Sequence, residues 1–152
     1  MILRFLLFST LLFAQRQITD AEVNEVHRAA LLIDTHNDVP MRTVTGFDIG
    51  EAATTGHTDI HRMRKGGYSA QFFAVYVAAS YAENGTAANR AMQMIDTVRH
   101  DIVGRYPQTF ELAHTAADVE RIRKSGKIAA LMGIEGGHAI EDSLRLLRNF
   151  YA

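Results

Sequence analysis

Apolar stretches of strand length recur along the chain and alternate with signals for helices. Residues 29–34 and 127–134 are short apolar runs, a pattern typical of strands buried on both faces of a parallel sheet. Residues 69–77 combine aromatic and β-branched side chains, which favour a strand, and residues 109–113 form a shorter, weaker candidate. The hydrophobic pattern therefore predicts four strands.

Helix signals fill the intervals around these strands. The predicted helices are one from the capping box of Thr19 and Glu22 to about Arg28, one over residues 58–65, a long one whose apolar stripe runs from Ala91 to Ile102, one capped near Thr115 and closed by Gly126, and a last one opened by Asp142. Strict alternation of strands and helices indicates a parallel sheet, because each crossover helix covers one of its faces. The sequence thus predicts an α/β fold.

The length of the chain limits the size of this fold. A complete eight-stranded β/α barrel needs about 250 residues, or about 31 per β/α unit, whereas the chain has 152. A complete barrel is therefore excluded, but about four units would fit. Hydrophobic residues make up 47% and charged residues 22%, a balance typical of a folded globular core.

The net charge and the cysteine content limit the binding partners and the metal ligands that this chain can have. The 16 basic and 17 acidic residues give a net charge of −1, which offers no general attraction to nucleic acid or to an anionic membrane. The absence of cysteine excludes disulfides, thiolate nucleophiles and cysteine-bound zinc. Any metal must therefore be held by histidines and carboxylates.

The first 14 residues have the pattern of a signal peptide. Arg4 provides an early cation, a short apolar run follows, and Ala14 precedes a polar segment. The run is too short to span a membrane, which takes about 20 apolar residues. We expect residues 1–14 to direct export to a periplasm, the medium or the cell surface, so that any membrane association follows export. Residues 15–152 would form the domain.

Two polar clusters follow the two most apolar strands. Residues 36–38 are His-Asn-Asp, and residues 135–138 are Glu-Gly-Gly-His. In parallel α/β folds, ligands bind at the carboxyl end of the sheet, where both clusters are expected. These clusters are therefore the first candidates for a functional site.

A metal site can be assembled from these clusters. His36 and Asp38 are two residues apart in an extended segment, so their side chains point the same way while Asn37 points away. Glu135 could join them from a separate strand, and its two oxygens would allow it to bridge a pair of metals. The alternative is structural, because a strand-end histidine and a loop-capping aspartate give the same His-x-Asp pattern.

Longer motifs carry a family resemblance over almost everything after residue 29. The chain resembles the N-terminal half of the membrane (renal-type) dipeptidase family in the following segments: Ile33-Asp34-Thr35-His36-Asn37-Asp38-Val39-Pro40, His57-Thr58-Asp59-Ile60 with Arg62, Gly66-Gly67, Ala70-Gln71-Phe72, Tyr76-Val77, Gly126-Lys127-Ile128-Ala129, Gly133-Ile134-Glu135-Gly136-Gly137-His138, and Leu144, Leu147-Arg148 and Phe150-Tyr151. These motifs recur in the family's order.

The resemblance implies a fold, an activity and a set of ligands. The fold is a metal-dependent (β/α)8 TIM barrel, present here as a partial barrel of about four N-terminal units. Its two-zinc site hydrolyses dipeptides; His36 and Asp38 match ligands of the first Zn²⁺, and Glu135 matches the carboxylate that bridges both ions and is assigned a catalytic role. Two further histidine ligands and later substrate-binding groups lie in the family beyond residue 152. We therefore expect negligible peptidase activity from this chain alone.

Other polar residues receive simpler interpretations. His138 is a candidate for an outer-shell hydrogen bond, since it follows Glu135, and Gln71 would either line the interior or pack. The remaining histidines considered are expected to be solvated or capping residues: His27, His57, His100 and His114.

Two other functions stay open. A non-catalytic half-barrel could act as a scaffold that pairs its open strand edges with another chain or, as a homodimer, with another copy. A related two-metal hydrolase could cleave a different amide or an ester.

Overall fold

The computed structural model describes residues 16–151, so the predicted signal peptide lies outside the described residues. The chain divides into two compact units, residues 1–30 and 31–152. In the described part of the first unit, helix α1 (Asp20–Ala29) begins at the predicted capping box. The Thr19 hydroxyl accepts from the Glu22 N–H, and the Glu22 carboxylate accepts from the Thr19 N–H.

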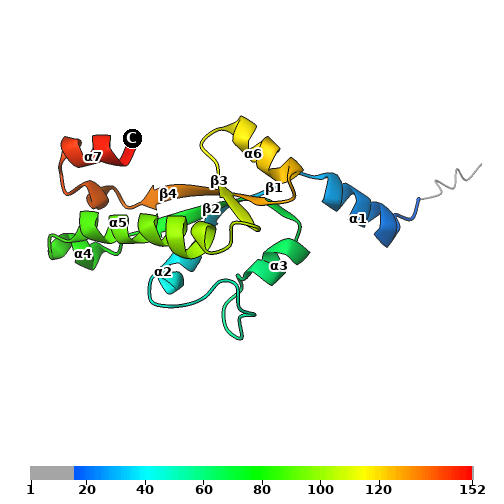
Figure 1. The fold of residues 1–152 in the computed structure, drawn as a ribbon, viewed down its shortest axis with the longest axis horizontal. Helices are drawn as coiled ribbons and strands as arrows, with labels where there is room; N and C mark the ends of the chain where they lie inside the picture. The colour runs from blue at the N-terminus through cyan, green and yellow to red at the C-terminus, as the bar shows by residue number, and fades with distance from the viewer. Residues whose placement is uncertain (1–15, 152) are drawn as a thin grey trace, which may run out of the picture. The chain divides into compact units, whose positions relative to one another are not determined.

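The second unit is built on a four-stranded parallel sheet (Figure 1). Its elements are β1 (Leu32–Asn37), α2 (Val39–Thr43), α3 (Ile60–Lys65), β2 (Tyr68–Tyr76), α4 (Ala79–Glu83), α5 (Ala87–Thr97), the π-helical segment η1 (Val98–Gly104), β3 (Phe110–Leu112), α6 (Ala116–Lys124), β4 (Ile128–Glu135), the 3-10 helix η2 (Gly137–Ile140) and α7 (Leu144–Tyr151). The predicted α/β fold with four parallel strands is confirmed. Among the described residues, no helix has the length and apolar character needed to cross a membrane.

The strands lie in the order β1-β2-β4-β3, which leaves β3 at an edge. In a barrel of successive β/α units, neighbouring strands follow one another along the chain, whereas here β4 lies directly beside β2. Strand β3 pairs with Ile128–Ala130, the first part of β4. In the described part of the chain, the remaining residues 131–135 have a ladder partner only in β2.

One face of the sheet, here called the closed face, packs against the helical segments α5 and η1. Phe73 packs against η1, and its ring meets Phe110 edge-on with 5.9 Å between centroids. Val75 packs against α5. Both residues are fully buried. The closed face comprises Phe73, Val75, Ile128, Ala130 and Met132.

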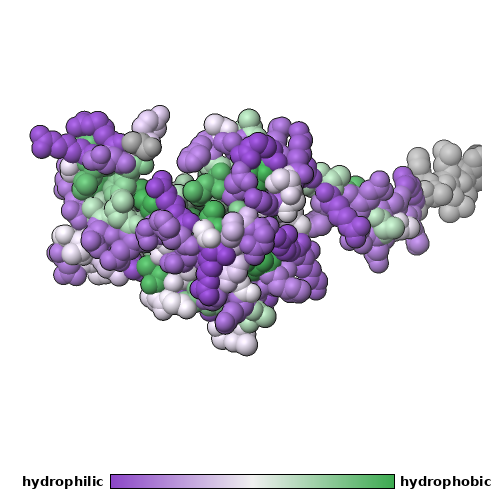
Figure 2. Space-filling model, viewed as in Figure 1, coloured by the Kyte–Doolittle hydropathy of each residue, from purple (hydrophilic) through white to green (hydrophobic). Residues whose placement is uncertain are grey.

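The other face, here called the open face, is covered by α6 at its N-terminal end (Figure 1). Side chains alternate between the two faces along each strand. The open face therefore includes Ile33, Ala70, Phe72, Ala74, Tyr76, Ala129, Leu131, Gly133 and Glu135. Figure 2 shows apolar surface reaching the outside between α6 and α7. The carboxyl ends of the strands are thus accessible on this side.

The prediction that residues 29–34 form a strand buried on both faces is wrong. Strand β1 begins later, pairs with β2 alone among the described strands, and leaves Ile33 39% exposed. An edge strand has a neighbouring strand along only one of its two edges, so its side chains have fewer neighbours, and apolar composition alone does not distinguish it from a central strand.

Two features of the helices also differ from prediction. Helix α2 was not among the predicted helices; Pro40 lies in its first turn, where a missing N–H breaks no helical hydrogen bond. Asp142 does not open the last helix, because Glu141 and Asp142 have φ angles of 48° and 53°, in the left-handed region, and α7 begins at Leu144. The long helix is confirmed as α5, which continues into η1.

Candidate metal centre

The carboxyl end of β1 is shaped by Asp34. Its carboxylate accepts hydrogen bonds from the His36 N–H at 3.1 Å and from the Tyr68 hydroxyl at 3.4 Å. Burial and then the neighbouring Asp34 charge raise the pKa of Tyr68 above its ordinary value. Asp34 thus fixes the backbone from which His36 projects. Sequence reasoning missed this role, although a carboxylate two residues before the histidine was an available signal.

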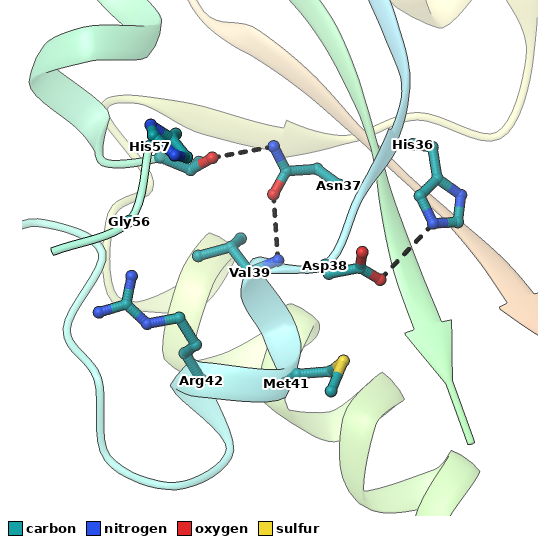
Figure 3. Close-up of a pocket in the computed structure, with 9 residues that line it drawn as sticks. His36, Asn37, Asp38, Val39, Met41, Arg42, Gly56 and His57 are labelled. Carbon is teal, nitrogen blue, oxygen red and sulfur yellow. Dashed lines mark hydrogen bonds and ion pairs between the residues drawn. The ribbon is translucent and has the colours of Figure 1, made fainter. Parts of the chain in front are cut away.

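Asn37 points away from His36 and Asp38, as predicted (Figure 3). Its amide nitrogen donates to the Thr58 hydroxyl at 3.0 Å, and its amide oxygen accepts from the Val39 N–H at 3.0 Å. These two bonds tie the strand end to the loop before α3 and to the start of α2. They leave the side chains of His36 and Asp38 free to face the opposite side.

Glu135 reaches the same region from the end of β4. It is the register partner of Tyr76, the last residue of β2, and its carbonyl accepts from the Val77 N–H at 3.2 Å. The alternation along β4 places its side chain on the open face. Two strands that are not adjacent in the sheet therefore bring their polar ends together.

The three predicted metal ligands lie close to one another. The His36 Nε2 atom is 3.5 Å from an Asp38 carboxylate oxygen and 3.1 Å from a Glu135 carboxylate oxygen. One ligand atom from each residue lies within 4.8 Å of the others. The side chains are 55%, 58% and 47% exposed, in chain order, so an ion could reach them from solvent.

The donor set fits a divalent ion such as Zn²⁺. Ligand atoms about 2.0–2.1 Å from zinc at tetrahedral angles lie about 3.3 Å apart, close to the two contacts measured here. The same distances suit ion pairs between a protonated His36 and two carboxylates. The three residues are thus brought together as a candidate centre, and their binding of a metal stays a prediction.

A cavity of about 420 Å³ opens beside His36 and Asp38 (Figure 3). The Arg42 guanidinium in its wall donates to the Thr55 carbonyl at 3.0 Å and lies 4.0 Å above the Phe47 ring, which holds the loop after α2. Sequence reasoning did not single out Arg42. The other lining residues are Asn37, Val39, Met41, Gly56, His57 and Thr58.

The other polar candidates take structural positions. The His138 Nε2 atom lies 2.7 Å from the Val77 carbonyl oxygen, so this contact is with backbone and not with the Glu135 carboxylate. Gln71 is fully buried, and its amide donates to the carbonyls of Asp34 and Phe72, so it packs. The remaining histidines considered are exposed: His27, His57, His100 and His114.

A parallel sheet with a candidate metal centre at the carboxyl ends of its strands defines a class of α/β proteins that includes β/α-barrel metal-dependent hydrolases. The family model "Membrane dipeptidase (Peptidase family M19)" matches residues 20–152. The chain belongs to this family.

Individual relatives agree with this assignment. The chain is 38% identical over 130 residues to dipeptidase ataJ of Aspergillus terreus, an alignment that covers 77% of this chain and 32% of that protein. The crystal structure of a metallopeptidase called dipeptidase AC matches with a TM-score of 0.67 and 27% identity, covering 80% of this chain and 39% of the other. A metallopeptidase of Rhodobacter sphaeroides, solved with a phosphinate mimic of the dipeptide L-Ala-D-Ala, matches with a TM-score of 0.61 and 25% identity over 79% of this chain and 43% of that one.

These comparisons settle the class and the extent of the match. The chain belongs to the membrane dipeptidase family of metallopeptidases, and its parallel four-stranded sheet is consistent with a partial TIM barrel. It spans 32% to 43% of the length of these three relatives.

Proposed function

We propose that this chain supplies part of the two-zinc centre of a dipeptide hydrolase. His36, Asp38 and Glu135 would hold one Zn²⁺, and the second carboxylate oxygen of Glu135 would be available to another Zn²⁺. The observation that carries the proposal is the convergence of three ligand atoms within 4.8 Å from two strand ends. A substrate of dipeptide size is supported by the family and by the dipeptide mimic bound to the Rhodobacter sphaeroides relative.

Bound zinc would polarise the scissile carbonyl and lower the pKa of a water molecule from about 16 towards about 7. The residues of this chain determine where that chemistry takes place. Asp34 and Asn37 hold the end of β1, so that His36 and Asp38 face the open side. The cavity beside these two side chains offers space for part of a small peptide.

The chain alone is proposed to lack turnover. It offers three ligands, whereas the resemblance places the remaining histidine ligands and substrate-binding groups in a segment of the family that follows the matching region. The activity of the whole enzyme is therefore best tested in a complete barrel, made by replacing the matching segment of the Aspergillus terreus relative with residues 31–151 of this chain.

The chimera should hydrolyse dipeptides, lose activity in a chelator and regain it when zinc is added. Glu135→Gln should reduce kcat by at least about 100-fold, since removing a metal ligand is expected to cost at least as much as the roughly 10- to 100-fold loss seen for outer-shell partners. Glu83→Gln, at an exposed glutamate of α4, is the matched control and should leave kcat unchanged.

The proposed function would be contradicted if a folded Glu135→Gln chimera hydrolysed dipeptides as fast as the chimera with Glu135. It would also be contradicted if activity survived complete removal of metal. If the chimera hydrolysed other amides or esters in preference to dipeptides, the alternative of a related two-metal hydrolase would be favoured. A stable dimer of the 152-residue chain that binds no zinc would favour the scaffold function, for which residues 131–135 of β4, paired only with β2 among the described residues, are the supporting observation.

A further inference from the structure

The turn that follows Glu135 is attached to Val77, the residue directly after β2, through the backbone N–H and the backbone carbonyl of Val77. The Val77 N–H donates to the Glu135 carbonyl at 3.2 Å, and the Val77 carbonyl lies 2.7 Å from the His138 Nε2 atom. Because a carbonyl oxygen only accepts, the proton of this second bond must be on His138 Nε2. Val77, the fully buried residue directly after β2, is therefore hydrogen-bonded to Glu135 before the Gly136-Gly137 pair and to His138 after it.

The conformation of this turn depends on Gly136. Its φ angle is 109°, in the region that favours glycine, and a Cβ atom there would lie 2.5 Å from His138 Cε1. The ring of His138 thus packs directly over the Gly136 backbone. Ala139, the next residue, is fully buried, and its N–H donates to the Gly136 carbonyl at 3.0 Å. The imidazole is consequently held in one place by packing and by hydrogen bonding.

Glu135 has no comparable packing of its own. Its side chain is 47% exposed, and one of its carboxylate oxygens lies 3.1 Å from His36 Nε2. The position of its carboxylate is therefore controlled mainly by the backbone at the end of β4. Any movement of the turn away from Val77 would rotate that backbone and separate Glu135 from His36 and Asp38.

From this geometry we infer that His138 is a positioning residue, whose bond to the Val77 carbonyl holds Glu135 where it can share a metal ion with His36 and Asp38. The inference rests on the proposed function, because it assigns His138 a role in the same metal centre. His138 acts through the backbone and does not touch the ion. An amide side chain that donates to Val77 should replace it, and an apolar ring should not.

The test is a titration of the 152-residue chain with Co²⁺, a zinc substitute with visible absorption, well below the unfolding temperature. Phenylalanine at this position fills the space without a donor, so His138→Phe should weaken Co²⁺ binding by about 10-fold or more, the usual effect of losing an outer-shell partner. His138→Gln should retain affinity within about threefold of the unmodified chain and keep its absorption spectrum.

Two controls separate positioning from general loss of stability. His114→Phe removes an exposed histidine elsewhere and should leave Co²⁺ affinity unchanged. Ile122→Val, at a buried residue of α6, should lower the unfolding temperature without changing Co²⁺ affinity or the absorption spectrum. If His138→Phe does not fold, His138→Asn replaces it, because its amide is too short to reach Val77 from the same turn.

Each outcome is decisive. Equal Co²⁺ affinity in the unmodified chain and in His138→Phe would overturn the inference, as would a loss in His138→Gln as large as that in His138→Phe. Absence of Co²⁺ binding by the unmodified chain would instead contradict the proposed metal centre itself. The failure of the inference and the failure of the proposed function are therefore distinguishable.

Discussion

Two neighbouring phenylalanines show how differently the two faces of the sheet are used. Phe73 projects from the closed face, is fully buried and meets the ring of Phe110. Phe72 projects from the open face and is only partly buried. The closed face packs against α5 and η1, whereas the open face packs against α6 only at its N-terminal end and presents polar groups at the carboxyl ends of its strands.

This division explains how a candidate metal centre can be exposed without weakening the fold. His36, Asp38 and Glu135 lie outside the three clusters of buried apolar side chains. Desolvating an unpaired charge is costly, so placing these ligands on the accessible face avoids that cost. Stability and metal binding should therefore respond to different substitutions.

The largest expected effect is on stability at the closed face. Phe73→Ala should lower the free energy of unfolding by about 3–5 kcal/mol, since it removes a fully buried ring and its contact with Phe110. Phe72→Ala, the matched substitution one residue away, should cost about half as much or less, because Phe72 is partly exposed already. Urea unfolding followed by circular dichroism measures both. Equal costs would show that the open face contributes as much packing as the closed face.

Local features of the fold could be predicted from sequence, because nearby residues determine them. The capping box of Thr19 and Glu22 has the same form in the structure as in the sequence pattern, and a second one begins α6 at Thr115 with Asp118. Strands β2 and β4 agree with prediction to within a residue. The alternation rule also placed Asn37 on the side away from its neighbours.

Features that depend on distant contacts were not predictable in this way. The exposure of Ile33 follows from the edge position of β1, which no local pattern reveals. The bond between His138 and Val77 joins residues 61 apart in the sequence. The convergence of Glu135 with His36 was predictable only by assuming that both strands end at the same edge of one parallel sheet.

A smaller effect is expected when zinc is added to the folded chain. A ligand that binds only the native state, at 100 times its Kd, raises the free energy of unfolding by about 2.7 kcal/mol. Zinc should therefore raise the unfolding temperature of the unmodified chain and of Glu83→Gln, but not that of Glu135→Gln. A shift of the same size in all three proteins, measured by thermal unfolding, would show that Glu135 does not hold the bound zinc.

The smallest effect concerns Asp118, which caps α6 over the N-terminal end of the open face. Hydrogen bonds from the Thr115 hydroxyl, then from Arg121 and the His114 N–H, lower the pKa of Asp118 from 3.8 to about 2. Because the pKa of Asp118 is lower in the folded chain than in the unfolded chain, its ionised carboxylate stabilises the fold above pH 3.8. This contribution to the free energy of unfolding is lost as the pH falls towards 2. Asp118→Asn should therefore reduce the dependence of stability on pH in this window and leave zinc binding unchanged. Carboxyl NMR titration of Asp118 measures the pKa directly; a midpoint near 3.8 would show that the cap does not select the ionised carboxylate.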